Sequence, residues 1–162
     1  MLLTIIVAVA AVTFVAIAGA ALTRIDGWYR ALRKPSWQPP DWLFGPAWTA
    51  IFGMVAASGV LAWRNAGDGA ERAWIIGLFA LNGVLNIAWS GLFFTLRRPD
   101  WALIEVPLLW FSIAALVVVI APVSAAGAWL LAPYLAWVAF AAYLNLTIVR
   151  LNGAAAQGVP TR

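Results

Sequence analysis

Apolar residues fall into five long runs separated by short polar segments. The runs cover about residues 2–22, 44–64, 73–96, 101–121 and 127–150. As an α-helix rising 1.5 Å per residue, each is long enough to cross about 30 Å of hydrocarbon. The alternation typical of membrane β-strands is missing. The pattern predicts an all-α membrane protein, with one five-helix transmembrane domain over residues 1–152 and a flexible tail at 153–162.

Composition supports this prediction. Hydrophobic residues make up 65% of the chain and charged residues 10%, and the mean hydropathy is +0.93. Soluble domains are about 45–50% apolar and about 25% charged, so much of the surface must face lipid. Cysteine and histidine are both lacking. That excludes thiolate or imidazole metal sites and histidine acid–base catalysis, so we expect no metal site, no required cofactor and no nucleic-acid partner.

The first run resembles a signal peptide at Ala18-Gly19-Ala20, which looks like a small-residue cleavage site. No basic residue precedes it, however, and its length exceeds the usual apolar core of about 7–15 residues. A retained helix is therefore favoured. Basic residues gather on one side of the expected membrane, at Arg24, Arg30, Arg33, Lys34, Arg97, Arg98, Arg150 and Arg162, against Arg64 and Arg72 on the other. The positive-inside rule predicts the N-terminus outside, with the first loop and the C-terminus in the cytoplasm.

The segment between the first two runs is long, with three prolines and several aromatic residues but no evident helix. Proline fixes φ and removes an amide donor, which favours a stiff, ordered loop. We interpret the segment as a lid over the mouth of the bundle, carrying Tyr29, Trp37 and Trp42. The alternative is a segment that simply lies on lipid headgroups.

Three runs carry aromatic and polar residues at helical spacing. These residues are Trp48 and Phe52 in the second run, Asn82, Asn86, Trp89 and Phe93 in the third, and Tyr134, Trp137, Ala141 and Asn145 in the fifth. Within each run the spacing of three or four places them on one face. An aromatic cavity with a few polar groups suits flat, largely apolar ligands. The alternative is that the asparagines bond neighbouring helices, at about 0.6 kcal/mol each, and the aromatics only pack.

Three further features of the sequence allow more than one interpretation. Small residues recur every fourth position at Gly45, Thr49, Gly53 and Ala57, and again at Ala128, Ala132 and Ala136, which fits either close packing within the chain or dimerisation. Glu105 lies near the start of the fourth run, where it could pair with Arg97 or Arg98, or take part in proton or ligand binding. Pro107 and Pro133 should each kink a helix or mark a local start.

Several motifs resemble those of the translocator protein family, also called tryptophan-rich sensory proteins, the TspO/MBR family or peripheral-type benzodiazepine receptors. They are Trp28-Tyr29, Lys34-Pro35-Ser36-Trp37, Pro39-Pro40-Asp41-Trp42, Phe44-Gly45-Pro46-Ala47-Trp48-Thr49, Leu85-Asn86-Ile87-Ala88-Trp89 and Pro133-Tyr134-Leu135-Ala136-Trp137. The resemblance covers about residues 28–150.

The resemblance implies a five-helix, commonly dimeric protein with a pocket beneath the first loop. The family binds porphyrins such as protoporphyrin IX, cholesterol-like sterols and benzodiazepine-type ligands. Carried over, the ligand tryptophan is Trp48 and the pocket asparagine is Asn86. The residues implicated in porphyrin breakdown are Tyr29 and Trp137, and the small residue that modulates binding is Ala141.

The chain departs from the family pattern at two places. Leu146 stands where the family's sterol motif has tyrosine, which weakens the expectation of sterol binding. Ser90-Gly91 replaces a proline pair, so we expect a straighter third helix.

Three functions follow from this reading. The first is a membrane receptor or sensor whose porphyrin stacks on Trp48, Trp89 and Trp137, its propionates meeting basic residues of the first loop. The candidate propionate contacts are Arg24, Arg30, Arg33 and Lys34. The second is a light- and oxygen-dependent porphyrin-degrading enzyme, with Tyr29 and Trp137 as candidate catalytic residues. The third is a transporter of porphyrin or sterol-like amphiphiles. The expected partners are porphyrin, the lipid bilayer and a second copy of the chain.

Overall fold

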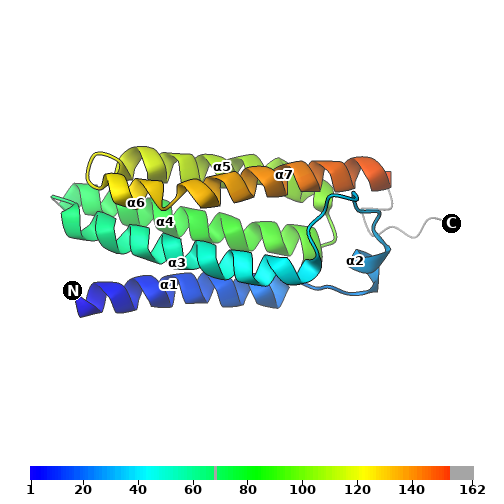
Figure 1. Cartoon of the computed structure of the whole chain (residues 1–162), viewed down its shortest axis with the longest axis horizontal. Helices are drawn as coiled ribbons and strands as arrows, with labels where there is room; N and C mark the ends of the chain where they lie inside the picture. Colours follow the sequence, from blue (N-terminus) through cyan, green and yellow to red (C-terminus); the bar gives the residue numbers. More distant parts are fainter. Residues whose placement is uncertain (68, 154–162) are drawn as a thin grey trace.

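The computed structural model describes residues 1–67 and 69–153. Most of the residues of the expected tail, 154–162, lie outside the described residues. The elements in chain order are α1 (Leu2–Leu22), α2 (Gly27–Ala31), α3 (Asp41–Asn65), α4 (Gly69–Ser90), the π-helix η1 (Gly91–Thr95), α5 (Pro99–Ile120), α6 (Ala125–Trp129) and α7 (Ala132–Asn152). Figure 1 shows them as a bundle of long, roughly parallel rods, with α2 beyond one end. All regular elements in the described ranges are helical, as predicted.

In the described part of the chain, five segments are long and apolar enough to cross a membrane. Their outward faces expose large apolar side chains such as Phe14 and Phe111, which water would not tolerate over so wide an area. Exposed tryptophans mark both ends: Trp42 and Trp101 near α2, and Trp74 and Trp129 at the opposite end. Tryptophan favours the membrane–water interface. The protein is therefore a multi-pass membrane protein.

Helix packing leaves the bundle widest at the end that holds α2. Helix α1 packs between α3 and α4, α4 packs on α5, and α5 packs on α7. Helix α3 packs mainly on α1 and then on α6, and it touches α7 little. Space therefore remains between the first half of α3 and the second half of α7. Helix α1 comes close to α4, where a Cβ built on Gly83 would lie 3.0 Å from Val15 Cγ2.

The fifth run is divided into two helices. Helix α6 ends at Trp129, and Pro133 lies in the first turn of α7, where its missing N–H costs no intrahelical bond. Pro133 thus marks a local start, one of its two expected roles. Pro107, in contrast, lies inside α5, which runs on from Pro99 to Ile120.

One local prediction was wrong, and one stays a prediction. The third run, which was expected to be straighter, ends in the π-turn η1, closed by a bond from the Leu96 amide to the Gly91 carbonyl at 2.8 Å, and its straightness stays a prediction. The segment between the first two runs was expected to lack a helix, yet it contains α2. The Asp26 carboxylate caps α2 by accepting a hydrogen bond from the Tyr29 amide at 3.1 Å.

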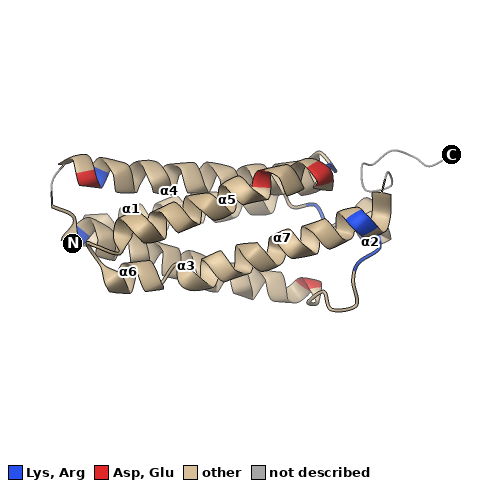
Figure 2. Ribbon diagram, turned by 90° about the horizontal axis from the view of Figure 1, so that it is seen from above, with Lys and Arg blue, Asp and Glu red and all other residues tan. Residues whose placement is uncertain are grey.

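Charged side chains lie mainly near the two ends of the bundle (Figure 2). Among the described residues, the end with α2 carries seven basic ones: Arg24, Arg30, Arg33, Lys34, Arg97, Arg98 and Arg150. The opposite end carries Arg64 and Arg72. Arg162 lies outside the described residues. The structure thus places the described basic residues on the expected sides, and the orientation in the membrane stays a prediction.

Candidate functional site

A cavity of about 670 Å³ occupies the wide end of the bundle, between α1, α3, α4, η1, α5 and α7. Loop 1, defined as residues 23–40, covers it. Most of the predicted ligand-binding residues line this cavity: Trp48, Phe52, Asn86, Trp89, Phe93, Trp137, Ala141 and Asn145. Tyr29 of loop 1 and Asp41 at the start of α3 line it as well. Residues from three separate runs are therefore brought together, as their spacing predicted.

Aromatic rings form much of the wall. Trp48 stacks on Phe52 with ring centroids 5.4 Å apart, and it meets Trp137 edge to face at 6.5 Å. Across the cavity, Trp89 stacks on Phe93 at 5.2 Å. The indole Nε1 atoms of Trp89 and Trp137 are buried, and neither has a hydrogen-bond partner in the described part of the chain. Because both atoms are shielded from the open space, the wall presents flat aromatic faces rather than these donors.

A chain of hydrogen bonds runs behind this wall. Asn86 Nδ2 donates to Tyr134 Oη at 3.0 Å, Tyr134 Oη donates to Asn82 Oδ1 at 3.2 Å, and Asn82 Nδ2 donates to Ser112 Oγ at 2.9 Å. Tyr134 and Asn82 are buried in the helix interfaces and lie outside the cavity lining. For Tyr134 and Asn82, the structure therefore shows the alternative role, in which their side chains bond neighbouring helices. Asn86 has both roles, since it lines the cavity and anchors the chain.

Asn145 also joins two helices. With its amide oriented to satisfy both atoms, it donates to the Pro99 carbonyl at 3.0 Å and accepts from the Leu103 amide at 3.1 Å. This ties α7 to the first turn of α5. Its place in the cavity wall is fixed by those contacts.

Tyr29 is the centre of the lid. Its hydroxyl donates to Asp41 Oδ1 at 3.2 Å and accepts from Gln38 Nε2 at 3.3 Å. Lys34 Nζ lies 3.8 Å from the centroid of the Tyr29 ring. Burial, together with the nearby Asp41 carboxylate, raises the pKa of Tyr29 to about 12. Tyr29 therefore keeps its proton at neutral pH and can donate it in a hydrogen bond.

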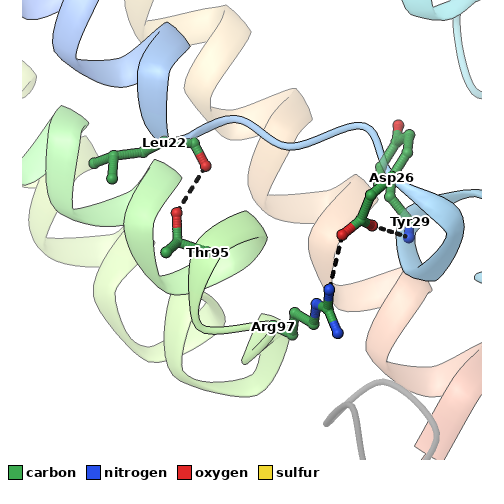
Figure 3. A network of polar contacts seen from close by, with 5 residues as sticks. All are labelled: Leu22, Asp26, Tyr29, Thr95 and Arg97. Atoms are coloured by element: carbon green, nitrogen blue, oxygen red, sulfur yellow. Dashed lines mark hydrogen bonds and ion pairs between the residues drawn. The ribbon is translucent and has the colours of Figure 1, made fainter.

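Loop 1 is fastened near its start. Figure 3 shows Arg97 Nη2 donating to Asp26 Oδ2 at 2.8 Å, and Thr95 Oγ1 donating to the Leu22 carbonyl at 2.8 Å. The hydrogen bond from the Tyr29 amide, followed by the Arg97 guanidinium, holds the pKa of Asp26 below its usual range. These contacts confirm the prediction of an ordered loop.

A second fastening joins loop 1 to the end of α7. Asn152 Oδ1 accepts from the Arg33 amide, and Asn152 Nδ2 donates to the Arg33 carbonyl, both at 2.8 Å. The Asn152 side chain thus pairs with both backbone groups of Arg33, as a residue of a neighbouring strand does in a β-sheet. Because Asn152 is also bonded to the Ile148 carbonyl at 2.8 Å, its amide is held in one orientation.

Some predicted site residues lie outside the lining. Trp37 stacks on Tyr143 with centroids 5.3 Å apart, on the outer side of loop 1, and Trp42 is 71% exposed. The candidate propionate contacts Arg24, Arg30, Arg33 and Lys34 do not line the cavity either, although Lys34 touches the lining residue Tyr29. Within the described lining, the charged side chain is that of Asp41.

Sequence reasoning missed one wall of the cavity. Helix α1 contributes Val12, Ala16, Gly19 and Ala20 to the lining, and α5 contributes Val106 and Leu109. These residues carry no polar or aromatic pattern that marks them. Small residues on α1 were the available signal, because they leave room for a ligand beside the helix.

The described geometry defines a class of protein: a five-span helical membrane protein with an aromatic cavity beneath an ordered loop. Comparison with known proteins gives the family. The TspO/MBR family model matches residues 5–151, and the chain belongs to this family.

Relatives are found in bacteria and in animals. The chain is 42% identical over 128 residues to the tryptophan-rich protein TspO of Chlorobaculum tepidum, which covers 77% of this chain and 79% of that one. It is 40% identical over 126 residues to the human translocator protein, covering 77% and 75% of the two chains. It is also 36% identical over 149 residues to protein CrtK of Rhodobacter capsulatus, covering 88% and 91%.

Proposed function

We propose that this protein is a membrane receptor or sensor that binds a porphyrin, or another flat apolar ligand, in the cavity beneath loop 1. The observation that carries this proposal is the meeting of Trp48, Trp89 and Trp137, from three helices, around one cavity of about 670 Å³. Pockets for compact organic ligands are about 300–1,000 Å³ and are mainly apolar. The family expectation of a tetrapyrrole ligand fits such a site.

Recognition would combine stacking with a few polar contacts. Each aromatic contact contributes about 0.5–1.5 kcal/mol beyond the buried area. For the porphyrin carboxylates, Lys34 is the favoured cation, because it lies against Tyr29 at the cavity mouth. Arg24, Arg30 and Arg33 would act through the electrostatic field at the surface.

Substitution of the wall tests this proposal. In lipid nanodiscs, Trp48→Ala and Trp137→Ala should each weaken protoporphyrin IX binding by about tenfold, equivalent to about 1.4 kcal/mol, because each removes a stacking surface. Trp42→Ala is the matched control, since Trp42 lies in the same helix as Trp48 but outside the lining. Titration of the porphyrin absorbance measures the affinity, with a sterol as a second ligand. Unchanged affinity in both cavity variants would refute the site.

Porphyrin breakdown is a second candidate function. The observation that favours it is that Tyr29 and Trp137, both oxidisable, line the same cavity. Light and oxygen would supply the oxidant. Product spectra recorded under illumination, with Trp137→Phe compared against the unaltered protein, distinguish turnover from binding. Equal product formation by the two proteins would remove Trp137 from that role.

We also propose that a second copy of the chain is a partner. Gly45, Thr49 and Gly53 of the α3 stripe line the cavity, which is why a Cβ built on Gly45 or Gly53 meets nothing within 4 Å. These small residues therefore make room for a ligand, and the proposal of a dimer is supported by the family expectation. Measurement of the mass in nanodiscs tests the dimer.

A further inference from the structure

Glu105 is a buried acid that the proposed ligand site does not use. It lies on the inner face of α5 and is 8% exposed. Both of its carboxyl oxygens are buried, and neither has a hydrogen-bond partner among the described residues. Its neighbours on α5, Val106 and Leu109, line the cavity, whereas Glu105 itself lies outside the lining. The acid is therefore enclosed between helices, behind the cavity wall.

The expected arginine partners are engaged elsewhere. Arg97 bonds Asp26 at 2.8 Å, and Arg98 bonds Asp100 at 2.5 Å. The prediction that Glu105 pairs with Arg97 or Arg98 was therefore wrong. The two arginines stay at the aqueous end of the bundle, where both members of each pair are partly exposed.

The packed helices offer Glu105 no other cation. Helix α1 contains no charged residue, and α4 with η1 contains none after Arg72. The charged residues of α3 and α7, namely Asp41, Arg64 and Arg150, lie near the helix ends. The buried titratable group of α7, Tyr134, has its hydroxyl bonded to Asn82 and Asn86 instead.

An ionised carboxylate in this place would lack both a counter-ion and hydrogen-bond donors. Removing such a charge from water costs several kcal/mol even after the protein relaxes, and the surrounding hydrocarbon supplies no compensation. The neutral acid avoids most of this cost. We propose that Glu105 is an intramembrane proton-binding site, a carboxylic acid that keeps its proton at neutral pH.

The protein contains two glutamates, Glu71 and Glu105, which makes the test selective. Protein labelled with ¹³C at glutamate Cδ gives two carboxyl signals in nanodiscs. Either Glu105→Gln or Glu71→Gln assigns both signals, so a folding failure of one variant does not prevent the measurement. At pH 7 the Glu105 signal should lie at the carboxylic acid position. A carboxylate signal for Glu105 at pH 7 would overturn the proposal. No ligand is needed, so the result is independent of whether the protein binds a porphyrin.

Discussion

Asn152 should control how often loop 1 opens. Asn152→Ala removes two hydrogen bonds to the Arg33 backbone. Each is worth about 0.5–1.5 kcal/mol, so about 1–3 kcal/mol of closure is lost. Since both bonds are exposed to water, the lower end applies, and the open population should grow about fivefold. Asn152→Asp, which keeps the acceptor and loses the donor, should give a smaller increase.

Hydrogen–deuterium exchange read by mass spectrometry measures this opening. Peptides from loop 1 should exchange about fivefold faster in Asn152→Ala, while peptides from α4 should not change. Asn65→Ala, at the opposite end of the bundle, is the control for loss of an asparagine. If loop 1 exchanged at the same rate in Asn152→Ala as in the unaltered protein, the reasoning about this contact would be refuted.

Two more predictions concern packing and the lid. Gly83→Ala should destabilise the protein by about 1–3 kcal/mol, because the new Cβ would lie 3.0 Å from Val15 Cγ2. A Cβ built on Gly77 meets nothing within 4 Å, so Gly77→Ala should instead stabilise the protein by about 0.5–1 kcal/mol. Thermal unfolding compares the two variants. Equal shifts of their unfolding temperatures would contradict this reasoning. Asp41→Asn should lower the pKa of Tyr29 from about 12, because a negative charge beside the phenolate is removed. Ultraviolet titration checks this, with Tyr29→Phe identifying the signal, and an unchanged pKa would contradict it.

The long helices could be predicted from the sequence because hydropathy and span length set them directly. Local breaks were harder. The division at Leu130 and Leu131 and the π-turn after Ser90 depend on how neighbouring helices pack, which apolar periodicity does not record. Helix α2 was missed, although Asp26 before Gly27 is a recognisable N-cap signal.

The cavity was predicted in part, because helical spacing gives a face but not a depth. It placed Trp48, Asn86 and Trp137 correctly in the lining, yet it could not separate them from Tyr134, which lies behind the wall. The partners of the basic residues were predicted least well. Sequence proximity suggested that Arg97 would reach Glu105, but the fold turns it to Asp26 instead.

The π-turn η1 sets the register of everything that follows it. A turn closed by a bond to the fifth preceding residue holds one residue more than an α-turn, and each residue advances a helix by about 100°. Tightening this stretch to regular α-geometry without removing a residue would rotate Arg97 by about 100° around the helix axis, away from Asp26. The wide turn thus absorbs one extra residue locally and keeps Arg97 on the side of the helix that faces loop 1.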